Sequence, residues 1–485
     1  MLLFARSLSE APTSVEVMGQ VKASLCSLLV ILILAIARCP VGVAVPFLAD
    51  ASEGAFRLRW KLDVEDLAGT SIRSFSLQTS RDGRRTLVGY SANVTSAIIM
   101  DENGKKVLTG TASTYPYPTL SAISSDGRAL VVSIEGGEEE DSILAWYDVD
   151  TRQQFQNASL GMGATIHSLA MSDDASLVAV SGVVWSDYTF IHAFDSQGRR
   201  LWSHVSKARE LVGYHEFSYK LSTVAASGEG NYVAAALRDM TVRFWGVCGG
   251  NNGVVLFNKQ GEMVWNYSDP ECVWNVAISG DGRRVAAVSS SQLYAFGGMG
   301  ELLWSRIFSG GTFALSDNGQ RLVAGNYEGT LLLADESGPY WKTQGNGFVE
   351  SVGISDSGDT SAAVVSRSDS RAPTARLVYV LNDQGRLLLN YSSTGPTGAL
   401  GASRVAVSGN GCCIVAALET DGVYYFEKSP SETRTTAIPE STDTNTSVET
   451  GSIQIAAAVL LLGLLGLIIA IHRRQIQRKK QQRAQ

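Results

Sequence analysis

The sequence predicts an all-β fold, a β-propeller of eight four-stranded blades, and three observations support this prediction. A strand-turn-strand pattern recurs through most of the chain. The recurrences are 37 to 55 residues apart, which suits a blade of four short strands. The segments between the turns are short apolar runs rich in Val, Leu and Ala. We expect residues 52–428 to form the propeller; seven blades are the alternative if the weakest stretch, 172–227, is an insertion.

Each repeat contains a tetrapeptide turn that begins with serine and usually ends with glycine. Glycine easily adopts the left-handed conformation that such a hairpin requires, and short polar side chains cap the turn. The third repeat has Ala175 at the glycine position, so we expect Asp174 to adopt the left-handed conformation there. The eight turns begin at Ser80, Ser124, Ser172, Ser227, Ser279, Ser316, Ser355 and Ser408.

A second polar turn follows in most repeats and leads to an outer strand that often ends in tryptophan. Asp195-Ser-Gln-Gly198, followed by Leu201-Trp202, is the clearest example. Because tryptophan recurs at one position of the repeat, we interpret these side chains as packing between blades.

The last repeat stops after its third strand, at residues 423–428. The missing strand is found at the other end of the propeller, where Phe56-Arg-Leu-Arg-Trp60 resembles an outer strand without a preceding turn. We expect this N-terminal strand to complete the last blade, because that pairing removes two exposed sheet edges.

The turns, together with Ala193-Phe-Asp195-Ser-Gln-Gly198-Arg-Arg-Leu-Trp202, resemble the WD-repeat and pyrroloquinoline-quinone-like propeller superfamily. The spacing from Asp to Gly differs from the quinoprotein pattern by one residue, and no repeat ends in a clear Trp-Asp pair. The layout of the whole chain also resembles single-span propeller proteins of archaeal cell surfaces. These resemblances imply a fold and leave the activity open.

Both ends of the chain carry membrane signals. Residues 23–37 form a 15-residue apolar run, and we assign 1–51 to a signal peptide or an uncleaved signal anchor. Residues 453–471 form a 19-residue apolar run, so we assign 452–472 to a transmembrane helix. The tail 473–485 has six Lys and Arg and no acidic residue, which predicts that it is cytoplasmic and that the propeller is extracellular.

Residues 429–451 are rich in Ser and Thr and predict a flexible stalk between the propeller and the membrane. Five Asn-x-Ser/Thr sequences are candidate glycosylation sites on an exported protein. They lie at Asn93, Asn157, Asn266, Asn390 and Asn445.

The charge of the body argues against one class of partner. Residues 50–472 contain 31 Lys and Arg against 45 Asp and Glu, a net charge of −14. Because such a body repels phosphates, we expect no nucleic-acid partner.

Cysteines provide two candidate features. Cys248 and Cys272 lie in the longest repeat, and an exported location permits a disulfide between them. Cys412 and Cys413 are adjacent, as in the vicinal disulfide of quinoproteins, but they occupy the position that holds Arg84-Arg85 in the first repeat. We therefore interpret this second pair as structural.

Metal sites are not predicted. The acidic run 135–141 lacks the alternating ligand spacing of a calcium loop, so we interpret it as a solvated loop between strands. The histidines do not have the spacing of a zinc site. The histidines are His167, His192, His204, His215 and His472.

We therefore expect a single-pass protein of the cell membrane whose extracellular propeller is a binding or scaffold module for a protein, a glycan or an envelope component. No catalytic, cofactor or metal residue is assigned and no cofactor is predicted, which favours a protein that is not an enzyme. Two alternatives stay open: a quinone- or metal-dependent surface oxidoreductase, and a self-associating structural protein of the envelope.

Overall fold

The computed structural model describes residues 55–429, except for 64–65, 68–73, 92–94, 112–119, 137–138, 185–187, 208, 212–215, 242–251, 310, 345–346, 370–371, 394–402 and 419–420. The predicted signal segment, the transmembrane helix, the basic tail and the stalk beyond residue 429 lie outside these residues. Within the part of the chain that is described, no helix has the length and apolar character needed to cross a membrane.

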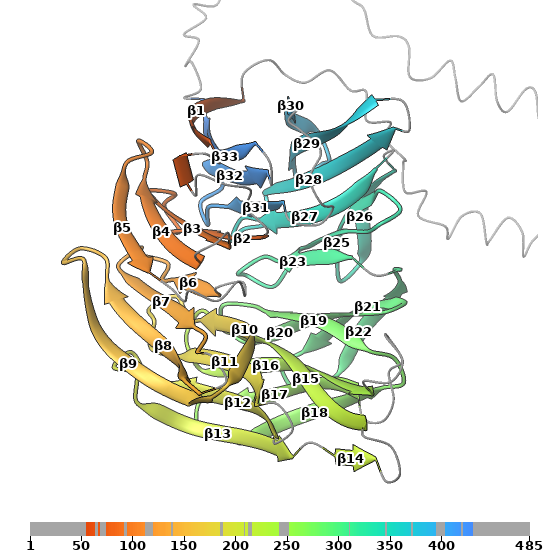
Figure 1. Cartoon of the computed structure of the whole chain (residues 1–485). Coiled ribbons are helices and arrows are strands. Elements are labelled where there is room, and N and C mark those ends of the chain that lie inside the picture. Colours follow the sequence, from red (N-terminus) through yellow and green to blue (C-terminus); the bar gives the residue numbers. More distant parts are fainter. Residues whose placement is uncertain are drawn as a thin grey trace, which may run out of the picture. The chain divides into compact units, whose positions relative to one another are not determined.

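The described strands form eight antiparallel sheets, which are the blades of a propeller (Figure 1). The prediction of eight blades is confirmed and the alternative of seven is wrong. Residues 172–227 are not an insertion, since they contribute strands to the third and fourth blades.

The first four blades consist of the following strands. Blade 1 contains β2 (Ser74–Thr79), β3 (Arg85–Ser91), β4 (Thr95–Asp101) and β5 (Lys106–Thr111); blade 2 contains β6 (Ser121–Ile123), β7 (Ala129–Ile134), β8 (Asp141–Asp148) and β9 (Gln153–Met162). Blade 3 contains β10 (Ala164–Met171), β11 (Val178–Val184), β12 (Tyr188–Phe194) and β13 (Arg200–Lys207). Blade 4 has a fifth strand and contains β14 (Arg209–Leu211), β15 (Glu216–Ala226), β16 (Tyr232–Thr241), β17 (Asn252–Asn258) and β18 (Met263–Asp269).

The remaining strands complete the ring. Blade 5 contains β19 (Val273–Ile278), β20 (Arg284–Ser289), β21 (Gln292–Gly297) and β22 (Leu302–Ile307); blade 6 contains β23 (Thr312–Leu315), β24 (Leu322–Gly325), β25 (Thr330–Asp335) and β26 (Gly338–Gln344). Blade 7 contains β27 (Phe348–Ile354), β28 (Thr360–Asp369), β29 (Ala372–Asn382) and β30 (Leu387–Ser393). Blade 8 contains β31 (Arg404–Val407), β32 (Cys413–Leu418), β33 (Gly422–Lys428) and β1 (Phe56–Asp63).

The N-terminal strand closes the ring as predicted. Strand β1 pairs antiparallel with β33, so that Phe56 lies opposite Lys428 and Asp63 opposite Gly422. In Figure 1 the first strand of the chain lies beside the last. Blade 8 is therefore built from both ends of the propeller sequence.

The hydrophobic core lies between neighbouring blades. Strand β32 is buried along its whole length, because its sheet is covered on both faces by other blades. One cluster joins Phe75 and Ile98 of blade 1 to Val415 and Tyr425 of blade 8. Outer strands such as β22 are mostly exposed. The apolar runs of the sequence are thus the middle strands, which have no solvent face.

The serine of each turn is buried and caps the turn from inside. In the first turn, the Ser80 hydroxyl oxygen accepts from the Arg85 N–H at 3.0 Å and donates to the Asp82 carboxylate at 2.6 Å. In the third turn Ala175 itself has a positive φ of 58°. The expectation that Asp174 would take this conformation is wrong, since the Asp174 carboxylate instead accepts from the Ser176 N–H at 2.9 Å and caps the turn.

The outer-strand tryptophans pack between blades, as predicted. A Cβ added to Gly261 would lie 2.6 Å from the Trp202 ring of the preceding blade, and one on Gly300 would lie 2.7 Å from the Trp265 ring. Both glycines also have positive φ, of 84° and 85°. Glycine is therefore required in the second turn for two reasons: the backbone conformation has a positive φ, and the indole beneath leaves no space for a Cβ atom.

Candidate functional site

The two faces of the propeller are built differently. The first and third connections of each blade lie on one face, which we call the turn face, and most of them are tetrapeptide turns. The second connection of each blade and the link to the next blade lie on the opposite face, which we call the loop face. The connection between β7 and β8 and the links from each blade to the next lie there. Binding residues are commonly carried by such loops on a rigid scaffold.

A continuous ring of main-chain hydrogen bonds joins the blades on the turn face. In each blade, an N–H of the serine turn donates to a carbonyl of the next blade, over distances of 2.7–3.2 Å. The donor-acceptor pairs are Arg81–Ser125, Ser125–Asp173, Asp173–Gly228, Glu229–Gly280, Gly280–Asp317, Asn318–Asp356, Asp356–Gly409 and Asn410–Arg81. The last pair returns to the first blade, so the ring is closed.

The Arg81 side chain ties this ring together. Its guanidinium pairs with Asp317 at 3.0 Å, with Asp173 at 3.9 Å, and with Asp356. Burial and the charges of Asp173 and Asp356 raise the pKa of Asp317. A Cβ on Gly280 would lie 2.2 Å from the Asp317 carboxylate, which explains the glycine there. We interpret the turn-face end of the propeller axis as a structural closure of the ring.

The loop-face end of the axis contains three β-bulges. The pairing register of β10, β19 and β27 shifts at His167, Trp274 and Glu350, one residue in each strand. Each of these residues stands five positions before the turn serine of its own blade. A bulge redirects a side chain and often lies next to a functional site. The same position of blades 3, 5 and 7 therefore presents a histidine, a tryptophan and a glutamate.

Two of these residues form a cluster with an arginine of blade 4. The Arg238 guanidinium of β16 lies over the Trp274 ring, 4.7 Å from its centroid. The ring is 37% exposed, and its Nε1 donates to the Ser290 hydroxyl at 3.1 Å. Burial, with a contribution from the Arg238 charge, lowers the pKa of His167 to about 4, so the imidazole is neutral at pH 7. We call His167, Arg238 and Trp274 the loop-face cluster.

Glutamates near this end of the axis connect blades. The buried Glu350 carboxylate lies 3.8 Å from Nε of Arg376 and accepts from the Ser403 N–H of blade 8 at 2.9 Å. Glu135 of blade 2 accepts from the Ile166 N–H of blade 3 at 2.8 Å. The interpretation of 135–141 as solvated is therefore wrong for Glu135, which is buried where its carboxylate accepts a main-chain N–H of the next blade.

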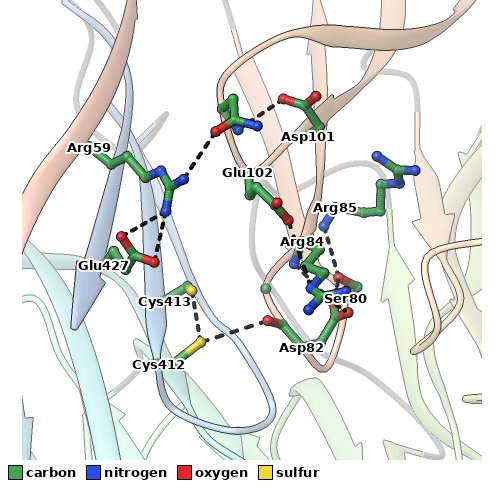
Figure 2. A network of polar contacts seen from close by, with 12 residues as sticks. Arg59, Ser80, Asp82, Arg84, Arg85, Asp101, Glu102, Cys412, Cys413 and Glu427 are labelled. Carbon is green, nitrogen blue, oxygen red and sulfur yellow. Dashed lines mark hydrogen bonds and ion pairs between the residues drawn. The ribbon is translucent and has the colours of Figure 1, made fainter. Parts of the chain in front are cut away.

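Figure 2 shows the junction between blades 8 and 1 on the turn face. Arg59 of β1 donates to both carboxylate oxygens of Glu427, each at 2.8 Å. Cys412 and Cys413 are free thiols with their sulfur atoms 2.8 Å apart. Cys413 is buried against blade 1, since a Cβ on Gly83 would lie 2.6 Å from its sulfur.

The Cys412–Cys413 pair occupies the same position in its repeat as Arg84-Arg85 does in the first repeat. Gly127 packs on Arg85 of the preceding blade just as Gly83 packs on Cys413, and each added Cβ would meet the side chain at 2.6 Å. The position predicted from the repeat is confirmed, and the contact supports the structural interpretation of this pair. Among the described residues, no three His, Cys, Asp or Glu side chains are placed to hold a metal ion.

The predicted glycosylation sites that are described share one position. Asn157, Asn266 and Asn390 are exposed on the outer strands β9, β18 and β30. Each is the fifth residue after the positive-φ residue of the turn before it, which is Arg152, Gly261 or Gly385. Asn93 and Asn445 lie outside the described residues.

The predicted disulfide is described at one of its two cysteines. Cys272 is disulfide-bonded and fully buried. Cys248 lies outside the described residues, so its pairing with Cys272 stays a prediction.

Comparisons with known proteins bear on the fold. No family model matches the sequence, and no curated protein matches it. The chain is similar to the C-terminal WD40 domain of Sif2, with 12% identity, a TM-score of 0.52, and coverage of 79% of this chain and 100% of that one. It is also similar to the propeller of Dos1, with 13% identity, a TM-score of 0.53, and coverage of 77% and 95%.

The structure and these likenesses define an eight-bladed β-propeller similar to WD40 propellers. At such low identity they establish the fold alone. The likenesses to quinoproteins and to archaeal surface proteins stay predictions.

Proposed function

We propose that this protein is a membrane-anchored extracellular propeller that binds a partner protein through its loop face. The observation that carries this proposal is the Arg238 guanidinium stacked on the exposed Trp274 ring at the loop-face end of the axis. The turn face, in contrast, has a closed ring of hydrogen bonds at its centre.

Further apolar side chains are exposed on the same face. Tyr327, in the turn between β24 and β25, is 61% exposed and stacks on Phe348 with ring centroids 4.7 Å apart. Ile307, at the end of β22, is 88% exposed. Tryptophan, tyrosine and arginine are the residues that most often dominate the binding energy of protein interfaces. The loop face of blades 4 to 7 presents all three.

The anchoring part of the proposal is supported by the sequence. The apolar run 453–471 and the basic tail 473–485 suit a single span, and the run 23–37 suits an export signal. The described sequons lie on outer strands, where glycans would leave the loop face uncovered.

Site-specific photo-crosslinking in cells that express the full chain tests the proposed face. A photoreactive phenylalanine analogue would replace Tyr327 on the loop face, and Met299, which is 82% exposed in a turn-face connection, would be the control. We expect a discrete adduct with another protein from position 327 and none from 299. Adducts from 299 alone would refute the loop-face assignment, and adducts only with a second copy of the chain would favour the self-associating alternative.

Extraction of membranes tests the anchor. We expect the full chain to stay in the membrane pellet at alkaline pH, and a chain ending at residue 451 to be released. A full chain that is extracted as readily as the truncated one would contradict the predicted span at 452–472.

A further inference from the structure

Arg238 differs from three other buried or half-buried arginines that the structure describes. Arg376 lies beside Glu350, Arg321 pairs with Asp359 at 2.6 Å, and Arg81 pairs with three aspartates. Within the described part of the chain, no carboxylate forms an ion pair with Arg238, and its Nε atom has no hydrogen-bond partner. Buried charges in proteins are normally paired, and the body has 14 more acidic than basic residues. The protein has ample acidic residues, yet none of those described pairs with this arginine.

The surroundings of Arg238 hold its guanidinium in place. The Trp274 ring supports one face of the guanidinium, and the hydrogen bond from its Nε1 to Ser290 orients that ring. Nε2 of His167, which is also buried, has no hydrogen-bond partner among the described residues. Because the Arg238 charge contributes to lowering the pKa of His167, the two side chains are electrostatically coupled. Burial lowers the pKa of Arg238.

We infer that the loop-face cluster binds the carboxylate of an acidic side chain on the partner, with Arg238 as the charged donor and Trp274 as the apolar wall beside it. This inference rests on the proposed function and specifies the chemistry of the partner. A guanidinium matches a carboxylate through two parallel N–H donors. One cation beside a neutral imidazole suits a singly charged anion better than a phosphate dianion. The exposed indole favours an aromatic or aliphatic residue next to the acidic one.

The test uses the full chain in detergent and two labelled hexapeptides. One peptide alternates Glu and Phe; the other has Gln in place of Glu. We expect the Glu peptide to bind at least about tenfold more tightly than the Gln peptide, because a charge-assisted hydrogen bond usually contributes that much to affinity. Arg238→Gln should abolish this preference. Arg306→Gln is the matched control, because Arg306 lies over Trp304, 5.9 Å from the ring centroid, on the outer strand β22.

Competition between anions identifies the chemical group that the loop-face cluster binds. Acetate should displace the Glu peptide at lower concentration than inorganic phosphate does, and the reverse order would overturn the carboxylate assignment.

A second variant tests the inference if Arg238→Gln does not fold. Trp274→Leu keeps the arginine and should weaken the binding of both peptides while retaining the preference for Glu. Equal binding of the two peptides by the unmodified chain would refute the inference, as would an undiminished preference in Arg238→Gln. If the partner adduct from position 327 forms while no preference for Glu exists, the proposed function stands and this inference fails.

Discussion

The indole of Trp60 stacks on the ring of Tyr425, with centroids 5.1 Å apart and planes inclined by 17°. These residues belong to the first and last strands of the propeller, so their contact joins the two ends of the ring. The Tyr425 hydroxyl also donates to the Gly83 carbonyl of blade 1 at 2.9 Å. The closure of the ring thus depends on a few side chains at one junction.

Replacement of Trp60 should loosen this closure. Trp60→Ala removes the stacked ring and leaves a gap beneath Gly104, whose added Cβ would lie 3.0 Å from the indole. We expect the free energy of unfolding to fall by about 2–3 kcal/mol, since the site is only partly buried. Urea denaturation measures this change. Leu58→Ala, at a 44% exposed position of the same strand, is the control and should change the midpoint little.

Loss of Arg81 should make stability depend on pH. Arg81→Gln leaves Asp173, Asp317 and Asp356 facing one another without their shared cation. Because the Arg81 charge opposes the raised pKa of Asp317, its loss should raise that pKa further, so the variant loses stability as pH rises through it. We expect a deficit of about 1–2 kcal/mol at pH 7 that shrinks toward pH 4. Urea midpoints from pH 4 to 8 test this, with Arg128→Gln, an exposed turn-face variant, as the control. A deficit independent of pH would contradict the assigned role.

Glu135 should make the unmodified protein less stable as pH rises. Burial raises the pKa of Glu135 to about 7, partly opposed by its hydrogen bond from the Ile166 N–H. An acid whose folded pKa exceeds its unfolded value contributes stability that is present at low pH and is lost as pH rises from about 4.5 through 7. We expect Glu135→Gln, which keeps an acceptor for the Ile166 N–H, to remove about 2–3 kcal/mol of this dependence. Parallel stability curves for Glu135→Gln and the exposed control Glu140→Gln would show that Glu135 does not titrate as described.

Cys412 should be the more reactive thiol of its pair. The hydrogen bond with Cys413 lowers the pKa of Cys412 to about 6 and raises that of Cys413. Cys412 is half-buried and Cys413 is buried. We expect iodoacetamide to label Cys412 first at pH 7, and Cys413→Ala to slow this labelling severalfold because the thiolate loses its hydrogen bond. Peptide mass spectrometry locates the label, and initial modification of Cys413 would refute the assignment.

The three described sequons share one position in the repeat, so we predict that they share the same glycosylation state. Asn157, Asn266 and Asn390 are all exposed on the outer strands, so we expect all three to carry glycans if the propeller is exported. The intact mass before and after enzymatic deglycosylation measures their occupancy. Three unmodified asparagines would argue against export by a glycosylating route.

The sequence by itself determined the architecture, because each blade repeats local signals that act over a few residues. The turn serines cap their own turns, and the turn glycines adopt conformations that other residues disfavour, so both could be recognised without a structure. Counting these signals was enough to predict eight blades and the strand that closes them. The exception at Ala175 was mispredicted because contacts within the turn overrode the residue preference.

Only the tertiary structure decided which residues meet. Arg81 and Asp317 are 236 positions apart in the chain, and the ring closure alone brings them to 3.0 Å. The loop-face cluster combines residues of blades 3, 4 and 5, and two of its members, His167 and Trp274, are redirected by bulges that the apolar pattern does not encode. The buried Glu135 carboxylate accepts from the Ile166 N–H of the neighbouring blade, 31 positions away in the chain. Contacts between blades depend on how the sheets are arranged around the axis, and no short stretch of sequence carries that information.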